Sequence, residues 1–197
     1  MIITKIRGMQ GKLLTLQDYK SLSAADTQES FFHMVARYPS YSYFKIIQND
    51  RISMQNQLYI SLVNDTNKIS LASPRLPNIH LPNLHLYKLK AQIQMIKIRY
   101  TDFLGNNEDF IQDLQGTIFY DILKPVKFGE YPFYLDLYFI EKQKKYMKKN
   151  KKVPASVFML DKYMEKKFQE IKQLIYISEE IEYGRKAEKR NFSISYR

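Results

Sequence analysis

Residues 156–182 read SVFMLDKYMEKKFQEIKQLIYISEEIE, and this stretch decides the fold class. Its apolar residues recur at spacings of three and four, which is the period of an α-helix with one buried face. Pro154 stands near the first turn, where a helix tolerates proline. We therefore predict one long C-terminal helix with a buried stripe of Val157, Leu160, Met164, Phe168, Ile171 and Ile175. The other faces are expected to carry the charges of Asp161, Lys162, Glu165, Lys166, Lys167, Glu170 and Lys172.

Two helices are predicted at the start of the chain. Apolar residues at helical spacing indicate a first helix over residues 2–14. Thr15 followed three residues later by Asp18 is typical of a capping box, in which each side chain bonds the other residue's backbone N–H. This pair predicts that a short second helix runs over residues 16–22.

A third helix is predicted before residue 38. Asp26, with Glu29 three residues on, indicates another capped start. Proline disfavours the helical conformation in the residue before it, so Pro39 should end this helix near Arg37. His33 is expected to pack at the edge of this helix.

The middle of the chain alternates between helical patterns and breaks. A helix is predicted over residues 52–72, and three prolines make residues 73–83 an extended connector. Further helices are predicted over residues 108–123 and 133–150. Between the connector and Gly105, an amphipathic helix is predicted from the stripe Leu86, Leu89, Ile93, Ile96 and Tyr100.

These elements predict an all-α fold. Six glycines and seven prolines in 197 residues are too few for the many turns of an all-β protein. We expect a multi-helix bundle of about two helical subdomains with a long C-terminal helix. The expected parts are an N-terminal subdomain over residues 1–72, the connector 73–83, a C-terminal subdomain over 84–184 and a basic tail over 185–197.

Composition excludes several classes of protein. With 45% hydrophobic and 26% charged residues, the chain has the composition of a globular protein. It contains no cysteine, which excludes disulfides and cysteine-based metal or redox sites. No stretch approaches the roughly 18 apolar residues of a membrane span, and the N-terminus lacks the apolar core of a signal peptide. A cytoplasmic location is expected, either free or attached to a larger assembly.

Motifs that carry chemistry are missing from the sequence. The glycines are scattered, so there is no phosphate-binding loop and no dinucleotide turn. His80 and His85 flank Pro82 and have no carboxylate between them, which makes a shared metal ion unfavoured. We therefore expect no catalytic residue, no metal and no cofactor. A small acid-base or metal-dependent enzyme is therefore less favoured than a protein that binds other molecules without catalysis.

The net charge of +11 is concentrated in one short segment. Residues 142–152 hold seven lysines and no acid, at the end of the helix predicted over 133–150. Tyr138, Phe139 and Tyr146 are interleaved and are suited to stacking on bases, so nucleic acid is one partner to consider. An acidic protein, an anionic membrane or a merely solubilising surface are the others. The predicted partner-binding residues are Lys142, Lys144, Lys145, Lys148, Lys149, Lys151 and Lys152.

A second interpretation comes from the N-terminal sequence. Residues 5–22 read KIRGMQGKLLTLQDYKSL, and this resembles the opening of the V/A-type ATPase C-subunit family, whose eukaryotic members are called d-subunits. That family starts with an arginine-bearing helix, then Leu-Leu-Thr, then Asp-Tyr and Leu. A small residue and an acid-containing helix ending in tyrosine follow, positions taken here by Ala24, Ala25, Glu29 and Tyr38, so the resemblance is closest over residues 5–38.

Two shorter segments are also similar to this family. YPFYLDLY at 131–138 resembles the segment before a long helix, and EIKQL at 170–174 resembles its recurring acid-Ile-Lys pattern. The family is longer and has three related helical units, whereas this chain has room for about two. The resemblance implies a shortened or divergent member.

The resemblance implies a function without catalysis. Proteins of this family are all-helical and sit between the central rotor shaft and the membrane ring of a proton- or sodium-translocating rotary ATPase. It therefore implies a central-stalk subunit, cytoplasmic and peripheral to the membrane, whose partners are the shaft and the ring. The alternative from the residues alone is a basic helical nucleic-acid-binding or scaffold protein.

Overall fold

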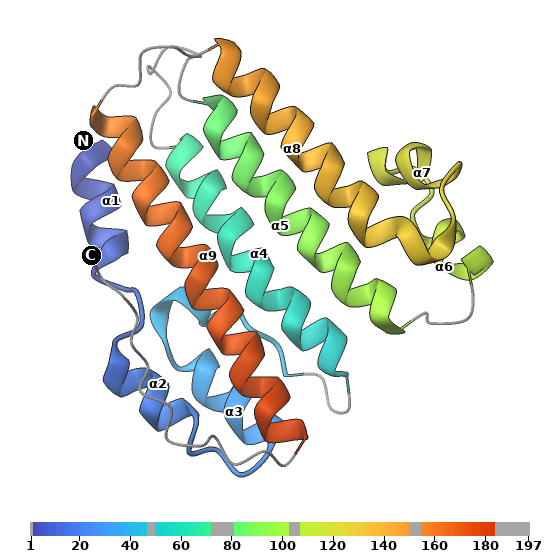
Figure 1. The fold of residues 1–197 in the computed structure, drawn as a ribbon. Helices are drawn as coiled ribbons and strands as arrows, with labels where there is room; N and C mark the ends of the chain where they lie inside the picture. Colours follow the sequence, from blue (N-terminus) through green and yellow to red (C-terminus); the bar gives the residue numbers. More distant parts are fainter. Residues whose placement is uncertain (1, 47–49, 72–80, 103–106, 150–154, 184–197) are drawn as a thin grey trace. The chain divides into compact units, whose positions relative to one another are not determined.

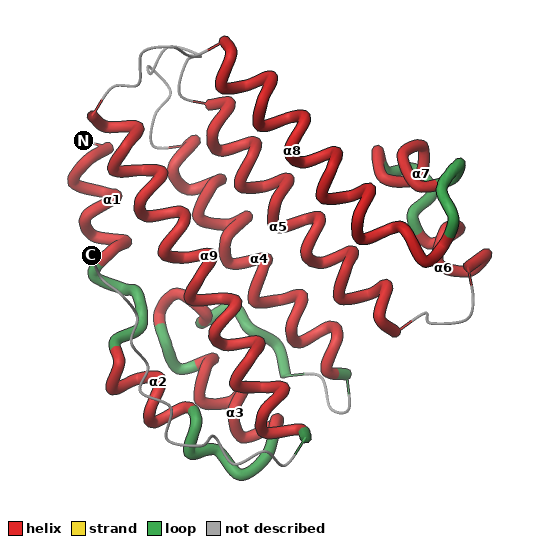
Figure 2. Tube along the Cα trace, in the orientation of Figure 1, coloured by secondary structure: helices red, strands yellow, loops and turns green. Residues whose placement is uncertain are grey.

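The fold is all-α, as predicted. The computed structural model describes residues 2–46, 50–71, 81–102, 107–149 and 155–183, and within these ranges every regular element is a helix (Figure 1 and Figure 2). The chain divides into two compact units. The first combines residues 1–61 with residues 159–197, and the second spans residues 62–158.

The first unit contains the N-terminal helices and the longest helix of the described chain. Its core consists of apolar side chains from all of these helices, including Ile6, Leu22, Phe31, Phe32 and Leu58. Phe32 stacks on Phe44 with ring centres 5.2 Å apart. The elements are α1 (Ile2–Gln10), α2 (Leu16–Leu22), α3 (Gln28–Ala36), the 3-10 turn η1 (Pro39–Tyr41), the first half of α4 (Arg51–Leu71) and most of α9 (Ala155–Glu182).

Helix α9 buries much of the stripe that its sequence predicts. Leu160, Met164, Phe168 and Ile171 are all buried, whereas Ile175 is only half-buried. The side chain of Val157 lies outside the described residues. The buried face is wider than predicted, because it also includes Tyr163, Lys167, Glu170, Leu174, Ile177 and Ser178. The prediction that Lys167 and Glu170 cover a solvated face is therefore wrong.

Helix α2 begins and ends where the sequence predicts. The Thr15 hydroxyl accepts a hydrogen bond from the backbone N–H of Asp18 at 3.3 Å. The Asp18 carboxylate in turn accepts one from the backbone N–H of Thr15 at 2.7 Å. Both bonds of the capping box are therefore present, and they satisfy backbone donors that the first turn leaves without partners.

The starts and ends of α1 and α3 differ from the prediction. Thr27, and not Asp26, caps α3, because the Thr27 hydroxyl accepts a hydrogen bond from Ser30 N at 3.1 Å. This helix ends at Ala36 with Arg37 as its cap, close to the predicted end. Helix α1 ends at Gln10 and does not reach residue 14. Leu14 is outside the helix: its side chain is buried, and its N–H donates to the Glu170 carboxylate and not to a helical carbonyl.

The second unit is a separate helical bundle with its own core. Helices α5 and α8 pack along each other, and the short helices α6 and α7 lie near one end of α8 (Figure 1). Its elements are α5 (Leu81–Asp102), α6 (Asn107–Asp113), α7 (Ile118–Leu123), the 3-10 turn η2 (Phe128–Glu130) and α8 (Tyr131–Lys149), together with the second half of α4. The buried cluster comprises Ile93, Ile96, Phe110, Leu114, Phe119, Leu123, Tyr131 and Leu135.

Two predictions in the second unit need correction. The single helix expected over residues 108–123 is two helices, and the turn between them contains Gly116 with a φ of 77° and the cap residue Thr117. Helix α8 begins at Tyr131, two residues earlier than expected. Pro132 is accommodated in its first turn, where its missing N–H costs no helical hydrogen bond.

The compact units differ from the predicted subdomains 1–72 and 84–184. Helix α9 belongs to the unit of the N-terminal helices, because its buried face bonds Leu14, Gln28 and Tyr41. Most of the predicted connector 73–83 lies outside the described residues, and residues 81–83 form the start of α5. The basic tail predicted over 185–197 is also outside them. Among the described residues, no helix combines the length and apolar character needed to cross a bilayer.

Candidate functional site

The predicted lysines that the structure describes lie on the C-terminal half of α8 (Tyr131–Lys149). Positive charge in this half suits the helix dipole, whose negative end is the C-terminus. The Lys142 ammonium lies 5.0 Å from the centre of the Tyr138 ring. Within the described side chains, Lys142, Lys144 and Lys145 are exposed. The side chains of Lys148, Lys149, Lys151 and Lys152 fall outside the described part.

A second feature of α8 was not predicted from the sequence. Three large apolar side chains before the lysines are exposed: Phe133 at 62%, Leu137 at 39% and Ile140 at 41%. Tyr131 and Leu135 of the same helix are buried in the core. Because successive residues are offset by about 100°, the exposed three lie on the opposite side of α8 from the buried pair. The four-three spacing of these residues is visible in the sequence and could have indicated this second face.

A buried polar cluster lies at the centre of the first unit. The Lys167 ammonium is 2.6 Å from Oε1 of Glu170, and the side chains are 0% and 3% exposed. The Tyr41 hydroxyl donates to the same Oε1 at 2.7 Å. The backbone N–H of Leu14 donates to the other oxygen, Oε2, at 2.6 Å. Glu170 thus accepts from three donors that belong to three different segments.

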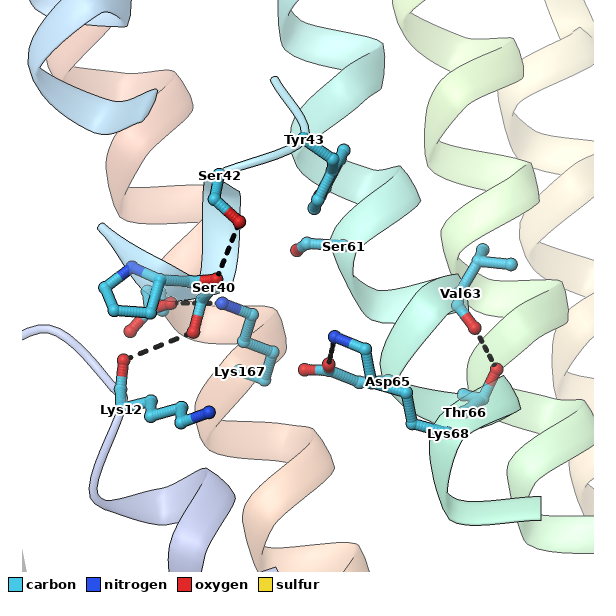
Figure 3. A network of polar contacts seen from close by, with 12 residues as sticks. Lys12, Ser40, Ser42, Tyr43, Ser61, Val63, Asp65, Thr66, Lys68 and Lys167 are labelled. Atoms are coloured by element: carbon cyan, nitrogen blue, oxygen red, sulfur yellow. Dashed lines mark hydrogen bonds and ion pairs between the residues drawn. The ribbon is translucent and has the colours of Figure 1, made fainter. Parts of the chain in front are cut away.

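The electrostatics of the cluster favour the neutral state of Tyr41. The Lys167 ammonium lies 4.0 Å from the centre of the Tyr41 ring, within cation-π range. Burial raises the pKa of Tyr41 well above its usual value, and the nearby Glu170 carboxylate raises it further. Figure 3 shows Lys167 extending from α9 toward the segment of Ser40, whose hydroxyl donates to the Lys12 carbonyl at 3.3 Å.

This cluster fastens helix α9 to the N-terminal segments. A buried carboxylate is costly unless it is paired and hydrogen-bonded, and Glu170 meets both conditions. Sequence reasoning missed it because charged residues are normally solvated. The signal available in the sequence is the four-three-four spacing of Tyr163, Lys167, Glu170 and Leu174, which places the pair on a strip with two large apolar side chains.

Polar contacts also hold α9 near its C-terminal end. Gln28 Nε2 donates to the Ser178 carbonyl at 2.9 Å, and Gln55 Nε2 donates to the Ser178 hydroxyl at 3.2 Å. Arg51 pairs with Glu182 at 2.7 Å. The pKa of Arg51 is raised, because hydrogen bonds to Tyr183 and Glu182 outweigh the opposing effect of burial. Helices α3 and α4 are therefore both joined to this end of α9.

The histidines do not assemble a metal site in the described structure. His33 is exposed, with its Nε2 3.8 Å from Glu29, so the expectation that it packs at the edge of the third helix is wrong. His85 is exposed on α5, and His80 lies outside the described residues. Within the described ranges, no three histidine or acidic side chains gather as metal ligands would.

Residues that carry the family resemblance contact one another in the first unit. The Tyr38 hydroxyl donates to Asp18 at 3.1 Å, which links the end of α3 to the capping box of α2. Partial burial raises the pKa of Asp18, but hydrogen bonds from Thr15 and Tyr38 outweigh it and leave that pKa below its usual value. Leu14 of the N-terminal match bonds Glu170 of the match at 170–174.

The match at 131–138 lies in the second unit. Tyr131 and Leu135 enter its core, and Asp136 pairs with Lys97 of α5 at 2.6 Å. Comparison of the chain with protein-family models, curated proteins and solved structures gives no match.

Proposed function

We propose that this chain is a non-catalytic subunit of a V/A-type rotary ATPase, located in the central stalk between the rotor shaft and the membrane ring. One observation carries the proposal. The two segments that resemble the C-subunit family in the first unit, 5–38 and 170–174, are joined by the Leu14–Glu170 hydrogen bond of 2.6 Å, whose residues are 156 apart in sequence. A pattern whose separate parts meet in space is more specific than either part alone.

The mechanical character of the first unit also supports a stalk role. A protein that carries torque needs helices that cannot slide past their neighbours. Helix α9 is tied to other segments at Glu170, Ser178 and Glu182. These points span 12 residues, or about 18 Å along the helix axis. Interlocking polar contacts over that length resist sliding better than apolar packing, which is non-directional.

The proposed location follows from the same interpretation. A central-stalk protein is cytoplasmic and peripheral to the membrane, and its partners are the shaft and ring subunits. The exposed lysines of α8 are suited to contact acidic neighbours or lipid headgroups near the ring.

Isolation of the native assembly tests the proposal. A tagged chain is purified from membranes solubilised in mild detergent, and the co-purifying proteins are identified by mass spectrometry. We expect shaft and ring subunits of a rotary ATPase in stoichiometric amounts. An intact ATPase purified from the same cells without this chain would overturn the proposal. Deletion of the chain should also separate ATP hydrolysis from ion pumping in membrane vesicles.

A disruption experiment links the assembly to the observation that carries the proposal. Glu170→Gln removes the charge that pairs with Lys167, whereas Glu165→Gln changes an exposed carboxylate on the same helix. We expect the first variant to reduce incorporation into the ATPase and the second to leave it unchanged. Equal incorporation of both variants would contradict a role for this contact in the assembly.

A second candidate function, nucleic-acid binding, is favoured by one observation. Lys142, Lys144 and Lys145 are exposed within four residues of chain, beside the half-buried Tyr138 and Tyr146. Phosphate contacts would make affinity fall steeply with salt. Binding to single-stranded RNA that weakens between low and physiological salt, and is lost when these lysines become Glu, would support it. Matched reversals at the exposed Lys12 and Lys20 should have no such effect.

A further inference from the structure

Helix α8 presents a second apolar face that the described residues of the second unit leave exposed. Phe133, Leu137 and Ile140 are exposed on the side opposite to the core, and Phe133 alone leaves 62% of its surface in water. A helix on the surface of a globular protein normally has one apolar face. Contiguous exposed apolar side chains indicate a surface that meets another molecule.

The spacing along this face is that of a helix-pairing seam. Phe133, Leu137, Ile140 and Lys144 are separated by four, three and four residues, the a/d spacing of a coiled coil. We call these four residues the outer strip. A strip of this width accommodates the side chains of a single partner helix.

The outer strip is apolar at its start and positively charged at its end, and this difference indicates how a partner helix would be oriented along α8. Its first three positions are apolar, and its last, Lys144, is exposed between Lys142 and Lys145, which are also exposed. A helix that lies antiparallel to α8 places its own N-terminus beside these lysines. Acidic side chains are favoured at a helix N-terminus, so the same carboxylates would suit both their own helix and the lysines of α8.

We propose that the outer strip binds one amphipathic helix of a partner protein, antiparallel to α8, with acidic residues in its first turns and apolar residues after them. The apolar residues pack on Phe133, Leu137 and Ile140, and the carboxylates pair with Lys144 and Lys145. This goes beyond the proposed function, because it specifies the chemistry of a partner and holds for any assembly that supplies such a helix.

Other occupants fit the outer strip less well. A helix lying on a membrane keeps its lysines beside or above the apolar face, whereas Lys144 is in line with the apolar side chains and would be pushed toward the lipid tails. Nucleic acid would contact the lysines and leave Phe133 in water. A second copy in parallel would bring lysines against lysines, and an antiparallel copy would supply no carboxylate for Lys144 from its own strip.

Designed peptides test the proposal on the full chain. The probe is a helix-stapled peptide of about three heptads, with Leu at the a and d positions, Glu in the first two turns and neutral residues elsewhere. A second peptide carries Lys in place of Glu, and a third carries the Glu residues in its last two turns. Fluorescence anisotropy at physiological salt measures each affinity. We expect the first peptide to bind about tenfold or more tightly than either of the others.

Substitutions in the outer strip test whether the peptide binds there and whether the lysines determine its charge preference. Leu137→Asp should weaken binding of the first peptide about tenfold or more, because it places a charge in the centre of the apolar contact. Lys144→Glu should lower the affinity for the peptide that carries Glu and raise the affinity for the peptide that carries Lys, so that the order of the two affinities reverses. Ile118→Asp is the matched control, since Ile118 is exposed at the first position of α7, where Asp is well tolerated. Circular dichroism checks that all three variants fold.

Several outcomes would overturn the proposal. Equal binding of the three peptides, or unchanged binding to the Leu137→Asp variant, would show that the outer strip is not the site. Sedimentation that reveals a dimer lost in Leu137→Asp would assign the strip to a second copy. Vesicle binding that needs anionic lipid and Leu137, without any preference for the Glu peptide, would assign it to a membrane.

Discussion

Lys167 and Glu170 form an ion pair that is wholly inside the first unit, with Nζ and Oε1 2.6 Å apart on successive turns of α9. Removing two charges from water is costly, and the cost is offset only where the geometry and the remaining hydrogen bonds are good. Here the carboxylate also accepts from Leu14 and Tyr41, and the ammonium lies over the Tyr41 ring. Replacing only one of the two residues should therefore lower the free energy of unfolding more than replacing both.

Glu170→Gln should destabilise the protein strongly. The variant leaves the buried Lys167 ammonium without a carboxylate, and breaking a buried pair in this way costs about 3–5 kcal/mol. Urea denaturation monitored by circular dichroism measures the change in the free energy of unfolding. The control is Glu165→Gln, on the exposed side of the same helix, which should change stability by no more than about 0.5 kcal/mol.

The double variant Lys167→Met/Glu170→Gln separates loss of the pair from damage to packing. A glutamine oxygen can still accept from the Leu14 N–H, and methionine fills most of the lysine volume. We expect the double variant to be more stable than Glu170→Gln alone, with a coupling energy within about 0.5–3 kcal/mol. If the changes in unfolding free energy of Lys167→Met and Glu170→Gln alone add up to that of the double variant, the two charges do not stabilise each other.

Tyr41→Phe should reduce stability at neutral pH and change its dependence on alkaline pH. The variant removes the hydroxyl that donates to Glu170, a hydrogen bond to a charged group worth about 1.5–3 kcal/mol. Burial and the Glu170 carboxylate raise the pKa of Tyr41 in the folded state. The unfolded chain therefore loses this proton first, and the stability that Tyr41 provides falls as pH rises above about 10.

Comparison of the two proteins above pH 10 checks the sign of this effect. The stability difference between wild type and Tyr41→Phe should be largest at neutral pH and should narrow as pH rises. The variant should still lose some stability as pH rises above about 10, because burial also raises the pKa of Tyr38 and Tyr59. A constant difference between pH 7 and pH 11 would contradict the assigned role of the hydroxyl.

The helices could be predicted from sequence where local signals determine them. The spacing of Leu160, Met164 and Phe168 identifies the buried face of α9, and Thr15 with Asp18 identifies the start of α2. Both depend on residues within one or two turns of each other. The break at Gly116 was missed because the apolar spacing continues across it, whereas the positive φ of Gly116 and the extended cap residue Thr117 separate α6 from α7.

Long-range pairing could not be predicted from sequence. Nothing near Lys167 and Glu170 in the sequence indicates that Leu14 and Tyr41, more than a hundred residues earlier, donate to the Glu170 carboxylate, or that the Tyr41 ring lies beside Lys167. The same contacts place α9 with the N-terminal helices and not with the helices that precede it in the chain. On α8, the lysines were recognised by composition, but the exposure of Phe133 depends on which face α5 covers.

Thr27→Ala should weaken the start of α3, whereas Asp26→Ala should not. The Thr27 hydroxyl accepts the hydrogen bond from Ser30 N at 3.1 Å, and loss of such a cap costs about 1 kcal/mol. Asp26 lies one residue before the cap and is exposed, so Asp26→Ala should change the free energy of unfolding by no more than about 0.5 kcal/mol. Thermal and urea denaturation of both variants distinguish them, and a larger effect at Asp26 would reassign the cap.

Gly116→Ala should destabilise the second unit through the backbone alone. Gly116 has a φ of 77°, and no atom outside its immediate neighbours lies within 4 Å of the position that a Cβ would occupy. The cost therefore comes from the left-handed conformation and amounts to about 1–2 kcal/mol. Gly129 also has open space but no positive φ, so Gly129→Ala should change the free energy of unfolding by less than about 0.5 kcal/mol. Equal effects of the two substitutions would show that conformation at residue 116 does not separate α6 from α7.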